Sequence, residues 1–103
     1  MKTNELTRAA LNWAVHYAIH GECEGYSPYE YSTDWAVGGP IIEREGIAMT
    51  KMQDAEVSWS ADSNPWEDWS TIHEGPTPLI AAMRCYVASK LGDEVDVPKE
   101  LTC

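Results

Sequence analysis

The sequence predicts an α+β domain with a helix near each end, an ordered loop rich in aromatic residues, and a small antiparallel sheet on which the C-terminal helix packs. Apolar residues recur at helical spacing in two segments, one near each end, and the stretch between them carries β-forming residues with partial alternation. At 103 residues the chain suits one compact domain rather than two. We therefore expect residues 1–103 to form a single domain, of which 93–103 are an acidic tail.

The first helix is expected at about residues 4–20, between a polar residue that can cap its start and Gly21, which supplies a stop. Its helically spaced apolar residues are Leu6, Ala9, Ala10, Trp13, Ala14 and Tyr17. Leu11 and Val15 lie off this stripe, so the helix is apolar on two flanks. We expect one flank to face the core and the other to be available to a second subunit.

The middle of the chain is expected to hold a loop and then a sheet. Residues 22–40 are rich in Gly, Ser, Tyr, Pro and Asp, which indicates an ordered loop with a short strand around Trp35. The β-forming residues that follow predict two antiparallel strands within 41–51 and 55–60, joined near residues 53–54.

A second loop is expected at residues 62–75, followed by the C-terminal helix. Thr77 suits the N-cap of this helix, and Pro78 suits its first position, where a missing N–H does no harm. Gly92 closes the helix. One face of the helix is apolar, formed by Leu79, Ile80, Met83, Tyr86, Val87 and Leu91.

Charge and cysteine usage restrict the partners and the compartment. Acidic residues outnumber basic ones by 17 to 7, which gives a net charge of −10. Phosphate binding needs Lys and Arg, so direct binding to nucleic acid or to an anionic membrane is disfavoured. No apolar run approaches the roughly 20 residues of a membrane span, and the N-terminus lacks the pattern of a signal peptide. We expect a cytosolic protein whose Cys23, Cys85 and Cys103 are reduced.

A metal site is one interpretation of three residues near the end of the first helix. His16 and His20 are spaced four residues apart, and Cys23 follows three residues later. No fourth ligand is near in the sequence, and His16 lies on the more polar side of the helix. Two surface histidines and a buried thiol explain the same residues, and we favour that interpretation.

The sequence offers no convincing catalytic set. Glu43 and Glu45 flank Arg44 on a predicted strand, which would place both carboxylates on one face, and a solvated strand edge explains them better than acid–base catalysis does. The Gly38-Gly39-Pro40 stretch is better interpreted as a turn than as a phosphate-binding loop. Nucleophile-elbow, Walker and dinucleotide-binding motifs are missing, so we expect a non-enzymatic protein without a cofactor.

The most suggestive feature is an aromatic, hydroxyl-rich loop combined with the start of an arginine-bearing helix. Rings stack on flat ligands, hydroxyls and carboxylates bind ribose-like groups, and a helix N-terminus with an arginine attracts phosphate or carboxylate. The predicted ligand-binding residues are Tyr26, Ser32, Thr33, Asp34, Trp35, Gly75, Thr77 and Arg84. For Arg84 the alternative is a stem that lies on the core with its head paired to a loop carboxylate.

Three segments, 32–35, 38–46 and 75–87, together resemble the NinX-type family of small tailed-phage and prophage proteins, long described as a domain of unknown function. Residues 3–15 and 92–101 are also similar, so the resemblance covers most of the chain. It implies a phage accessory protein in the host cytoplasm, encoded among often dispensable genes that modify host processes or counter host defence. The family supplies no agreed reaction, so a mechanism must come from the residues.

Two main functional hypotheses follow. In the first, the protein is a non-enzymatic homo-oligomer that counters host defence by binding and sequestering a small nucleotide-like signal molecule. In the second, it is an acidic protein–protein inhibitor or nucleic-acid mimic that acts on a basic host nuclease or DNA-binding complex. A third hypothesis, an accessory subunit in phage recombination or replication, rests only on the gene neighbourhood expected for the family.

Overall fold

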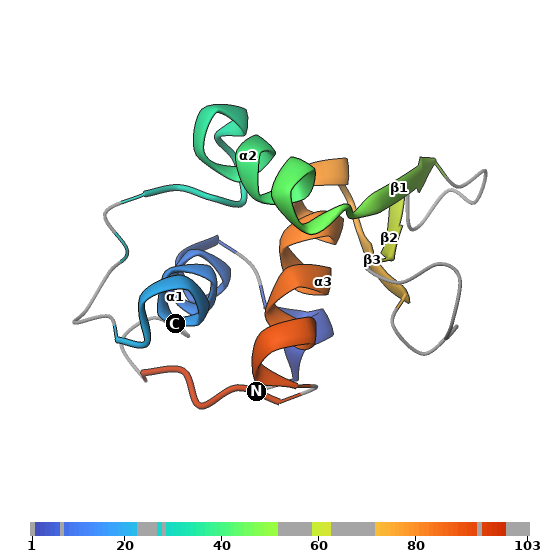
Figure 1. The fold of residues 1–103 in the computed structure, drawn as a ribbon. Helices are drawn as coiled ribbons and strands as arrows, with labels where there is room; N and C mark the ends of the chain where they lie inside the picture. Colours follow the sequence, from blue (N-terminus) through green and yellow to red (C-terminus); the bar gives the residue numbers. More distant parts are fainter. Residues whose placement is uncertain are drawn as a thin grey trace.

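The fold is α+β, as predicted, and is shown by a computed structural model (Figure 1). The structure describes residues 2–6, 8–22, 27, 29–51, 59–62, 72–92 and 94–98. Within them the elements run in the order η1 (Thr3–Glu5), α1 (Arg8–His20), α2 (Trp35–Glu45), β1 (Ala48–Lys51), β2 (Trp59–Asp62), β3 (Ile72–Gly75) and α3 (Pro78–Leu91).

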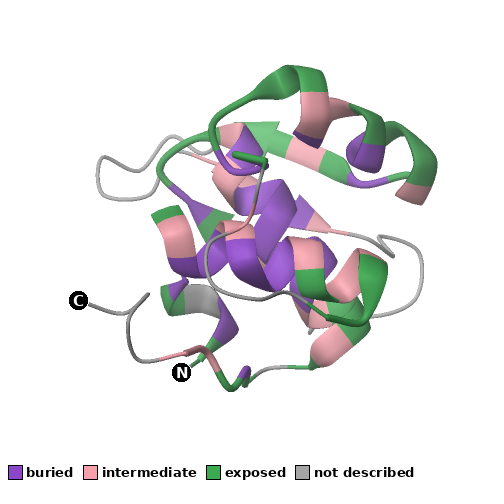
Figure 2. Cartoon of the chain, turned by 90° about the vertical axis from the view of Figure 1, so that its left-hand side faces the viewer, coloured by how far each residue is buried: buried purple, intermediate pink, exposed green. Residues whose placement is uncertain are grey.

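Helix α3 lies at the centre of the molecule, with α1 on one side, the sheet on the other, and α2 across its N-terminal end (Figure 1). The predicted boundaries are confirmed: the Thr77 hydroxyl accepts a hydrogen bond of 3.1 Å from the Ile80 amide, Pro78 opens the helix, and Gly92 is its C-cap. The prediction of a single apolar face was too narrow. Because neighbours surround α3, its side chains are buried at Leu79 and from Ala81 to Val87 (Figure 2).

Helix α2 was not predicted, since the sequence analysis placed a loop and a strand over Trp35–Glu45. The Asp34 carboxylate caps its start by accepting from the Ala36 amide at 2.9 Å. Gly46, at a φ of +67° in the left-handed region, forms its C-cap. The Gly38-Gly39-Pro40 stretch, predicted as a turn, lies inside this helix. Local propensity opposes a helix at these three residues, but the caps and the buried Ile41 and Ile42 stabilise one.

At Gly38, α2 approaches the rest of the molecule closely. A β-carbon at this residue would lie 2.5 Å from the carbonyl oxygen of Tyr31 and 2.7 Å from Cδ1 of Leu79. Glycine therefore allows α2 to lie against both the segment that precedes it and the first turn of α3.

The sheet is antiparallel with the order β1-β2-β3, and Ala61 pairs with Met49 on one side and His73 on the other. The predicted pair of antiparallel strands is present. The first begins at Ala48, later than predicted, because residues 41–45 lie in α2, and the second, Trp59–Asp62, ends two residues past its predicted end. The predicted connection near 53–54 lies outside the described residues. The prediction of a loop over 62–75 was wrong at its end, because Ile72–Gly75 forms β3.

The N-terminal segment packs against α3 and contacts the residues that follow this helix. Helix α1 begins at Arg8 rather than near residue 4, because Thr3–Glu5 forms a separate 3-10 turn. The Thr3 hydroxyl donates to the Gly92 carbonyl at 2.7 Å, and Lys2 forms a β-bridge with Glu94. These contacts join the N-terminal segment to the residues at and just after the C-terminus of α3.

Both apolar flanks of α1 are used within this chain. Leu11 and Val15, which the sequence analysis left available to a second subunit, are 0% exposed in the core. They lie among the side chains that α1 packs toward α3, together with Ala10, Trp13 and Ala14. The oligomer prediction therefore loses the observation on which it was based.

Candidate functional site

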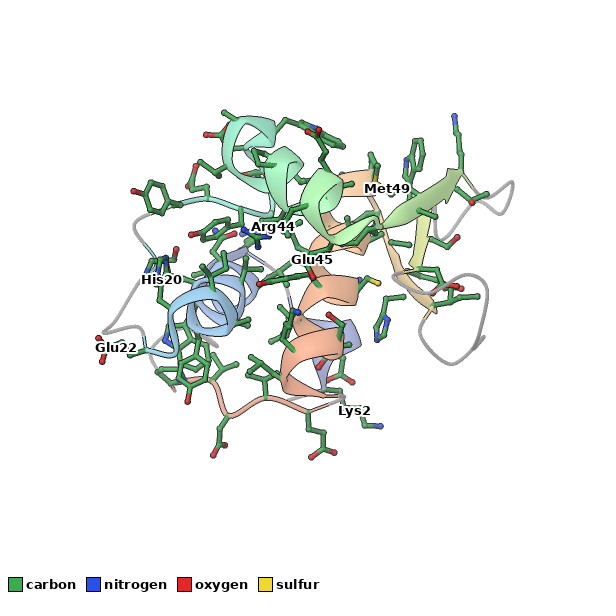
Figure 3. All side chains as sticks on the ribbon, in the orientation of Figure 1. Lys2, His20, Glu22, Arg44, Glu45 and Met49 are labelled. Atoms are coloured by element: carbon green, nitrogen blue, oxygen red, sulfur yellow. The ribbon has the colours of Figure 1, made fainter. Side chains whose placement is uncertain are left out.

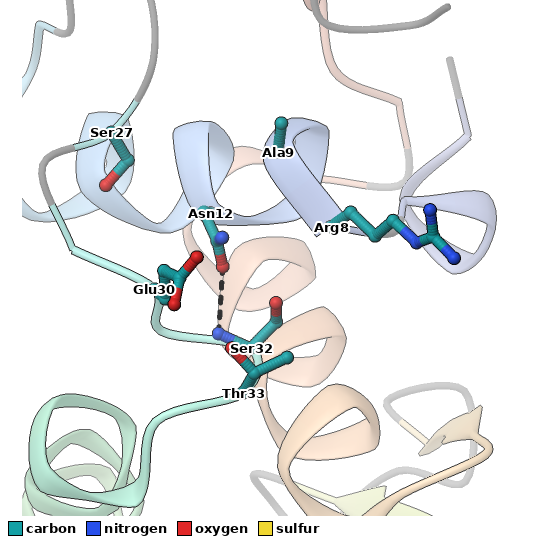
Figure 4. Close-up of a pocket in the computed structure, with 7 residues that line it drawn as sticks. All are labelled: Arg8, Ala9, Asn12, Ser27, Glu30, Ser32 and Thr33. Atoms are coloured by element: carbon teal, nitrogen blue, oxygen red, sulfur yellow. Dashed lines mark hydrogen bonds between the residues drawn. The ribbon is translucent and has the colours of Figure 1, made fainter.

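A pocket of about 360 Å³ lies between α1 and the segment that leads to α2 (Figure 4). It is lined by Arg8, Ala9, Asn12, Ser27, Glu30, Ser32 and Thr33. Its size falls in the range of about 300–1,000 Å³ that is typical of small-molecule sites. One wall is helical and the other is a loop, so the geometry depends on the contacts that hold the loop to α1.

Two hydrogen bonds hold the loop to α1. The Ser32 amide donates to Oδ1 of Asn12 at 2.9 Å, as the dashed line in Figure 4 shows. One helical turn further along, Nδ1 of His16 lies 3.2 Å from the hydroxyl of Tyr31. Asn12 and His16 share one helix face, so neighbouring turns of α1 position the loop wall.

The loop wall is also shaped by hydrogen bonds within itself. The carbonyl of Glu30 accepts from the amides of Thr33, at 3.2 Å, and Asp34, at 2.8 Å. The Ser27 hydroxyl donates to the Tyr29 carbonyl at 2.8 Å, and the Tyr29 amide lies 3.1 Å from the same hydroxyl oxygen. These turns hold the backbone of the wall in a defined conformation before any ligand arrives.

Ser32 carries the clearest sign of a missing contact. Its side chain is 1% exposed, and within the described residues its Oγ has no hydrogen-bond partner. Figure 4 shows this hydroxyl pointing from the loop toward α1. An unsatisfied buried polar group costs about 1–3 kcal/mol.

The charged residues at the pocket are Arg8 and Glu30, both exposed. Arg8 has a φ of +48°, which makes it the one non-glycine residue with a positive φ in the described part of the chain. Such backbone conformations are concentrated at functional sites. No ion pair is made by its guanidinium with the residues that the structure describes, so it remains available to an anion.

A cluster of rings adjoins the pocket at the C-terminal end of α1. The rings of His16 and His20 are 4.3 Å apart, His16 lies 6.3 Å from Tyr29, and Tyr29 meets Tyr31 edge-on at 5.8 Å. Figure 3 shows His20 on the side of α1 that faces the segment leading to α2. Burial lowers the pKa of His16, and the nearby charge of His20 lowers it further, so the imidazole is neutral at pH 7.

This histidine pair has no third ligand in the described structure. Cys23, the third member of the predicted set, lies outside the described residues. No group of three or more His, Cys, Asp or Glu side chains able to hold a metal ion occurs among the residues that are described. Of the two histidines, His16 contacts the rings of Tyr29 and Tyr31.

Some of the predicted ligand residues line the pocket, and others cap helices. Ser32 and Thr33 line the pocket. Asp34 caps α2, and Trp35, the first residue of that helix, is 50% exposed. Tyr26 lies outside the described residues.

The other three predicted residues lie around the start of α3 and, in the described structure, do not line the pocket. Gly75 is buried where β3 meets α3, and Thr77 is the N-cap of α3. Arg84 is 9% exposed and donates through Nε to the Leu6 carbonyl at 2.9 Å and through Nη1 to the Glu74 carbonyl at 2.7 Å. The alternative expected for Arg84 was a loop carboxylate partner, but the acceptors are the backbone carbonyls of Leu6 and Glu74.

Burial lowers the pKa of Arg84, although a guanidinium stays charged under ordinary conditions. The two carbonyls offset part of the cost of placing that charge inside the protein. Arg84 thereby connects α3 to the N-terminal segment and to β3. This structural role accounts for every contact that we observe at its head group.

Glu43 and Glu45 lie in α2 rather than on a strand, which corrects their predicted setting. Glu45 contacts Nε of Arg44 at 3.2 Å and Nζ of Lys90 at 3.3 Å, and so joins α2 to α3 (Figure 3). Burial alone would raise the pKa of Glu45, but the hydrogen bonds and charges of Arg44 and Lys90 outweigh it and hold the pKa below its ordinary value. The group is a structural ion pair.

Sequence reasoning missed five residues of the pocket: Arg8, Ala9, Asn12, Ser27 and Glu30. A signal for the helical ones was present, because Arg8, Asn12, His16 and His20 recur every four residues and form one polar stripe on α1. Of these residues, the sequence analysis interpreted only His16 and His20, as surface histidines. In the structure Asn12 and His16 contact the loop wall.

The site belongs to a small phage protein whose family is known. A family model described as Bacteriophage P22, NinX matches residues 19–90. Because this match covers more than half of the chain, the chain belongs to the NinX family, and the resemblance found in the sequence is confirmed. The matched region contains the loop wall of the pocket, and Arg8 and Asn12 precede it.

A search among curated proteins found none that matches the chain. In the described residues, no helix is both long enough and apolar enough to cross a membrane.

Proposed function

We propose that this phage accessory protein is a non-enzymatic binding protein that holds a small nucleotide-like ligand between α1 and residues 27–33, and that it counters host defence by sequestering a signal molecule in the host cytoplasm. The observation that carries the proposal is the buried Ser32 hydroxyl, which has no partner among the described residues and lines a pocket large enough for a ligand.

The lining matches the chemistry of a nucleotide. Arg8 offers a guanidinium to a phosphate oxygen, and its planar group can donate two parallel hydrogen bonds. The hydroxyls of Ser32 and Thr33 can donate to or accept from ribose hydroxyls. Glu30 can accept from a ribose hydroxyl or an exocyclic amine.

Sequestration requires affinity and no turnover. None of the residues that line the pocket needs to change its protonation state or form a covalent bond for this function. The hydrogen bonds that fix the loop wall also favour affinity, because a site held in its binding conformation loses less entropy when the ligand binds.

The proposal includes a homo-oligomer. Its support is the exposure of large rings on the outside of the monomer, where Trp35 is 50% and Tyr17 is 37% exposed. Size-exclusion chromatography with light scattering measures the assembly directly. A strict monomer over the working concentration range would remove this part of the proposal.

The ligand is tested by isothermal titration calorimetry against cyclic dinucleotides and ADP-ribose derivatives. Arg8→Gln should weaken binding at least tenfold, because it removes the proposed phosphate contact. Arg44→Gln is the matched control, since it removes the same charge from a side chain that is 57% exposed and lies outside the pocket. No binding across the panel, or equal effects of both substitutions, would count against the proposal.

The acidic-inhibitor hypothesis remains the second candidate, favoured by the net charge of −10. Charge-driven association with a basic host nuclease or DNA-binding complex should slow steeply as salt rises. Capture of such a partner at both low and high salt would contradict it. Arg8→Gln would leave that association unchanged or strengthen it, whereas it should weaken ligand binding.

A further inference from the structure

We infer that the binding site extends beyond the pocket along α1 to the exposed rings of Tyr29 and His20, and that its ligand carries a flat base at one end and a separate anionic group at the other. This inference rests on the proposed function. It defines the class of ligand as a base joined to a second group through two or more phosphates, or as two linked nucleotides.

The polar stripe of α1 gives the site its length. Arg8, Asn12, His16 and His20 follow one another at intervals of four residues, so each neighbours the next along one slanting ridge of the helix. At about 1.5 Å per residue, Arg8 lies roughly 12 Å from His16 and roughly 18 Å from His20 along the helix axis. Figure 4 shows the Arg8 side chain extending away from Asn12, which lengthens the site further.

The ring cluster has a fixed inner part and an open outer part. Tyr31 is 5% exposed and its hydroxyl contacts His16, so these two rings hold the cluster against the protein. Tyr29 is 49% exposed, and His20 is exposed as well. An exposed ring supported from behind is suited to stacking on a nucleobase, because every base presents a π-face.

The pocket and the cluster are physically connected. The hydroxyl of Ser27 lines the pocket and also makes both of the hydrogen bonds that fix the Tyr29 backbone. On α1, Asn12 lines the pocket one turn before His16, whose ring contacts Tyr29 at 6.3 Å. A ligand seated in the pocket would therefore have the rings at one end and the Arg8 guanidinium at the other.

The length of the site selects among nucleotides. In a nucleoside monophosphate about six bonds separate the glycosidic nitrogen from the phosphorus, so at about 1.5 Å per bond the two are less than roughly 9 Å apart. Such a ligand is shorter than the axial distance between Arg8 and the histidines of the ring cluster. A diphosphate-bridged or dinucleotide ligand can span the distance.

The test compares AMP, ADP-ribose and cyclic di-AMP by calorimetry at one salt concentration, with ribose 5-phosphate as a probe that has no base. AMP should bind at least tenfold more weakly than the better of the two longer ligands. Which of those two binds more tightly distinguishes the diphosphate from the dinucleotide class. Tyr29→Leu should weaken the better ligand about tenfold, a loss within the measured range for base–aromatic stacking. The same substitution should leave the affinity for ribose 5-phosphate unchanged.

A further variant keeps the result interpretable. Tyr29→Phe keeps the ring and should retain wild-type affinity. If Arg8→Gln weakens binding while Tyr29→Leu does not, the pocket stands and the extension to the rings is overturned. If the wild-type protein binds none of the probes, the extension and the proposed function both fall.

Discussion

The amide oxygen of Asn12 accepts a hydrogen bond of 2.9 Å from the backbone N–H of Ser32, and this contact joins the helical wall of the pocket to its loop wall. Asn12 is only half-buried, whereas Ser32 is 1% exposed, so the donor has little access to water if the acceptor is removed. The two walls of the site are therefore coupled through one side chain.

Asn12→Ala should destabilise the protein by about 1–2 kcal/mol, because the buried Ser32 amide loses its acceptor. Urea unfolding measures the change, and ligand affinity should fall with it as the loop wall loosens. Asn12→Asp keeps an acceptor oxygen and should lose less stability. Equal stability of wild type and Asn12→Ala would show that water replaces this contact.

Arg84→Leu should cost about 2–3 kcal/mol of unfolding free energy, since it leaves the carbonyls of Leu6 and Glu74 without their donor. Arg84→Lys keeps a charge but not the two-pronged geometry, and should fall between wild type and Arg84→Leu. A variant with normal stability that no longer binds ligand would instead assign Arg84 to the binding site.

Gly38→Ala should destabilise by about 1–3 kcal/mol, because the new methyl group would meet the backbone oxygen of Tyr31, which cannot rotate away. Gly39→Ala is a matched control in the same helix. Its methyl group would lie 3.7 Å from Trp35 Cε3, an ordinary contact, so alanine should be neutral or stabilising there by up to about 1 kcal/mol. Thermal unfolding of the two variants gives the comparison, and equal values would contradict the close approach of α2.

The stability of the protein should depend on the protonation of His16. Its pKa is lowered in the folded state, by burial first and by His20 second, from an ordinary value of 6.5. The unfolded chain therefore binds this proton more readily, so the stabilisation is present above pH 6.5 and is lost as the pH falls through the folded pKa. His16→Gln should remove this loss between about pH 7.5 and 5.

The measurement is the difference in unfolding free energy between wild type and His16→Gln at several pH values. Carboxylates titrate alike in both proteins, so the difference isolates the histidine. A constant difference across the range would show that His16 does not sense its surroundings in this way.

Local signals were sufficient for α3 and insufficient for α2. The Thr77 cap, Pro78 and Gly92 each act within one helical turn, and all three were placed correctly. In α2 the local signals conflict, because Gly38-Gly39-Pro40 opposes the helix that Asp34 and Gly46 delimit. Packing against α3 decides the outcome, and packing cannot be read from spacing alone.

The site shows the same limit. Ser32 and Thr33 were identified because hydroxyls in an aromatic loop suggest a ligand, whereas Asn12 was missed because a polar residue on an amphipathic helix normally faces water. Arg84 was considered for a ligand because arginine often binds anions, and the structure places its head group on backbone carbonyls 78 and 10 residues away in sequence. Which polar side chains converge depends on how the loop docks, which is a tertiary property.

The contacts that join the N-terminal segment to the far end of α3 also set an order of events during synthesis. Thr3 contacts Gly92, and the carbonyl of Leu6 accepts a hydrogen bond from Arg84, which is synthesised later. A ribosome adds about 5–20 residues per second, so several seconds pass between the synthesis of the first and the second residue of each contact. During that time the apolar side chain of Leu6, which is 0% exposed in the finished fold, has no core to enter. The Leu6 side chain therefore stays exposed to solvent until α3 has been made and the N-terminal segment packs against it.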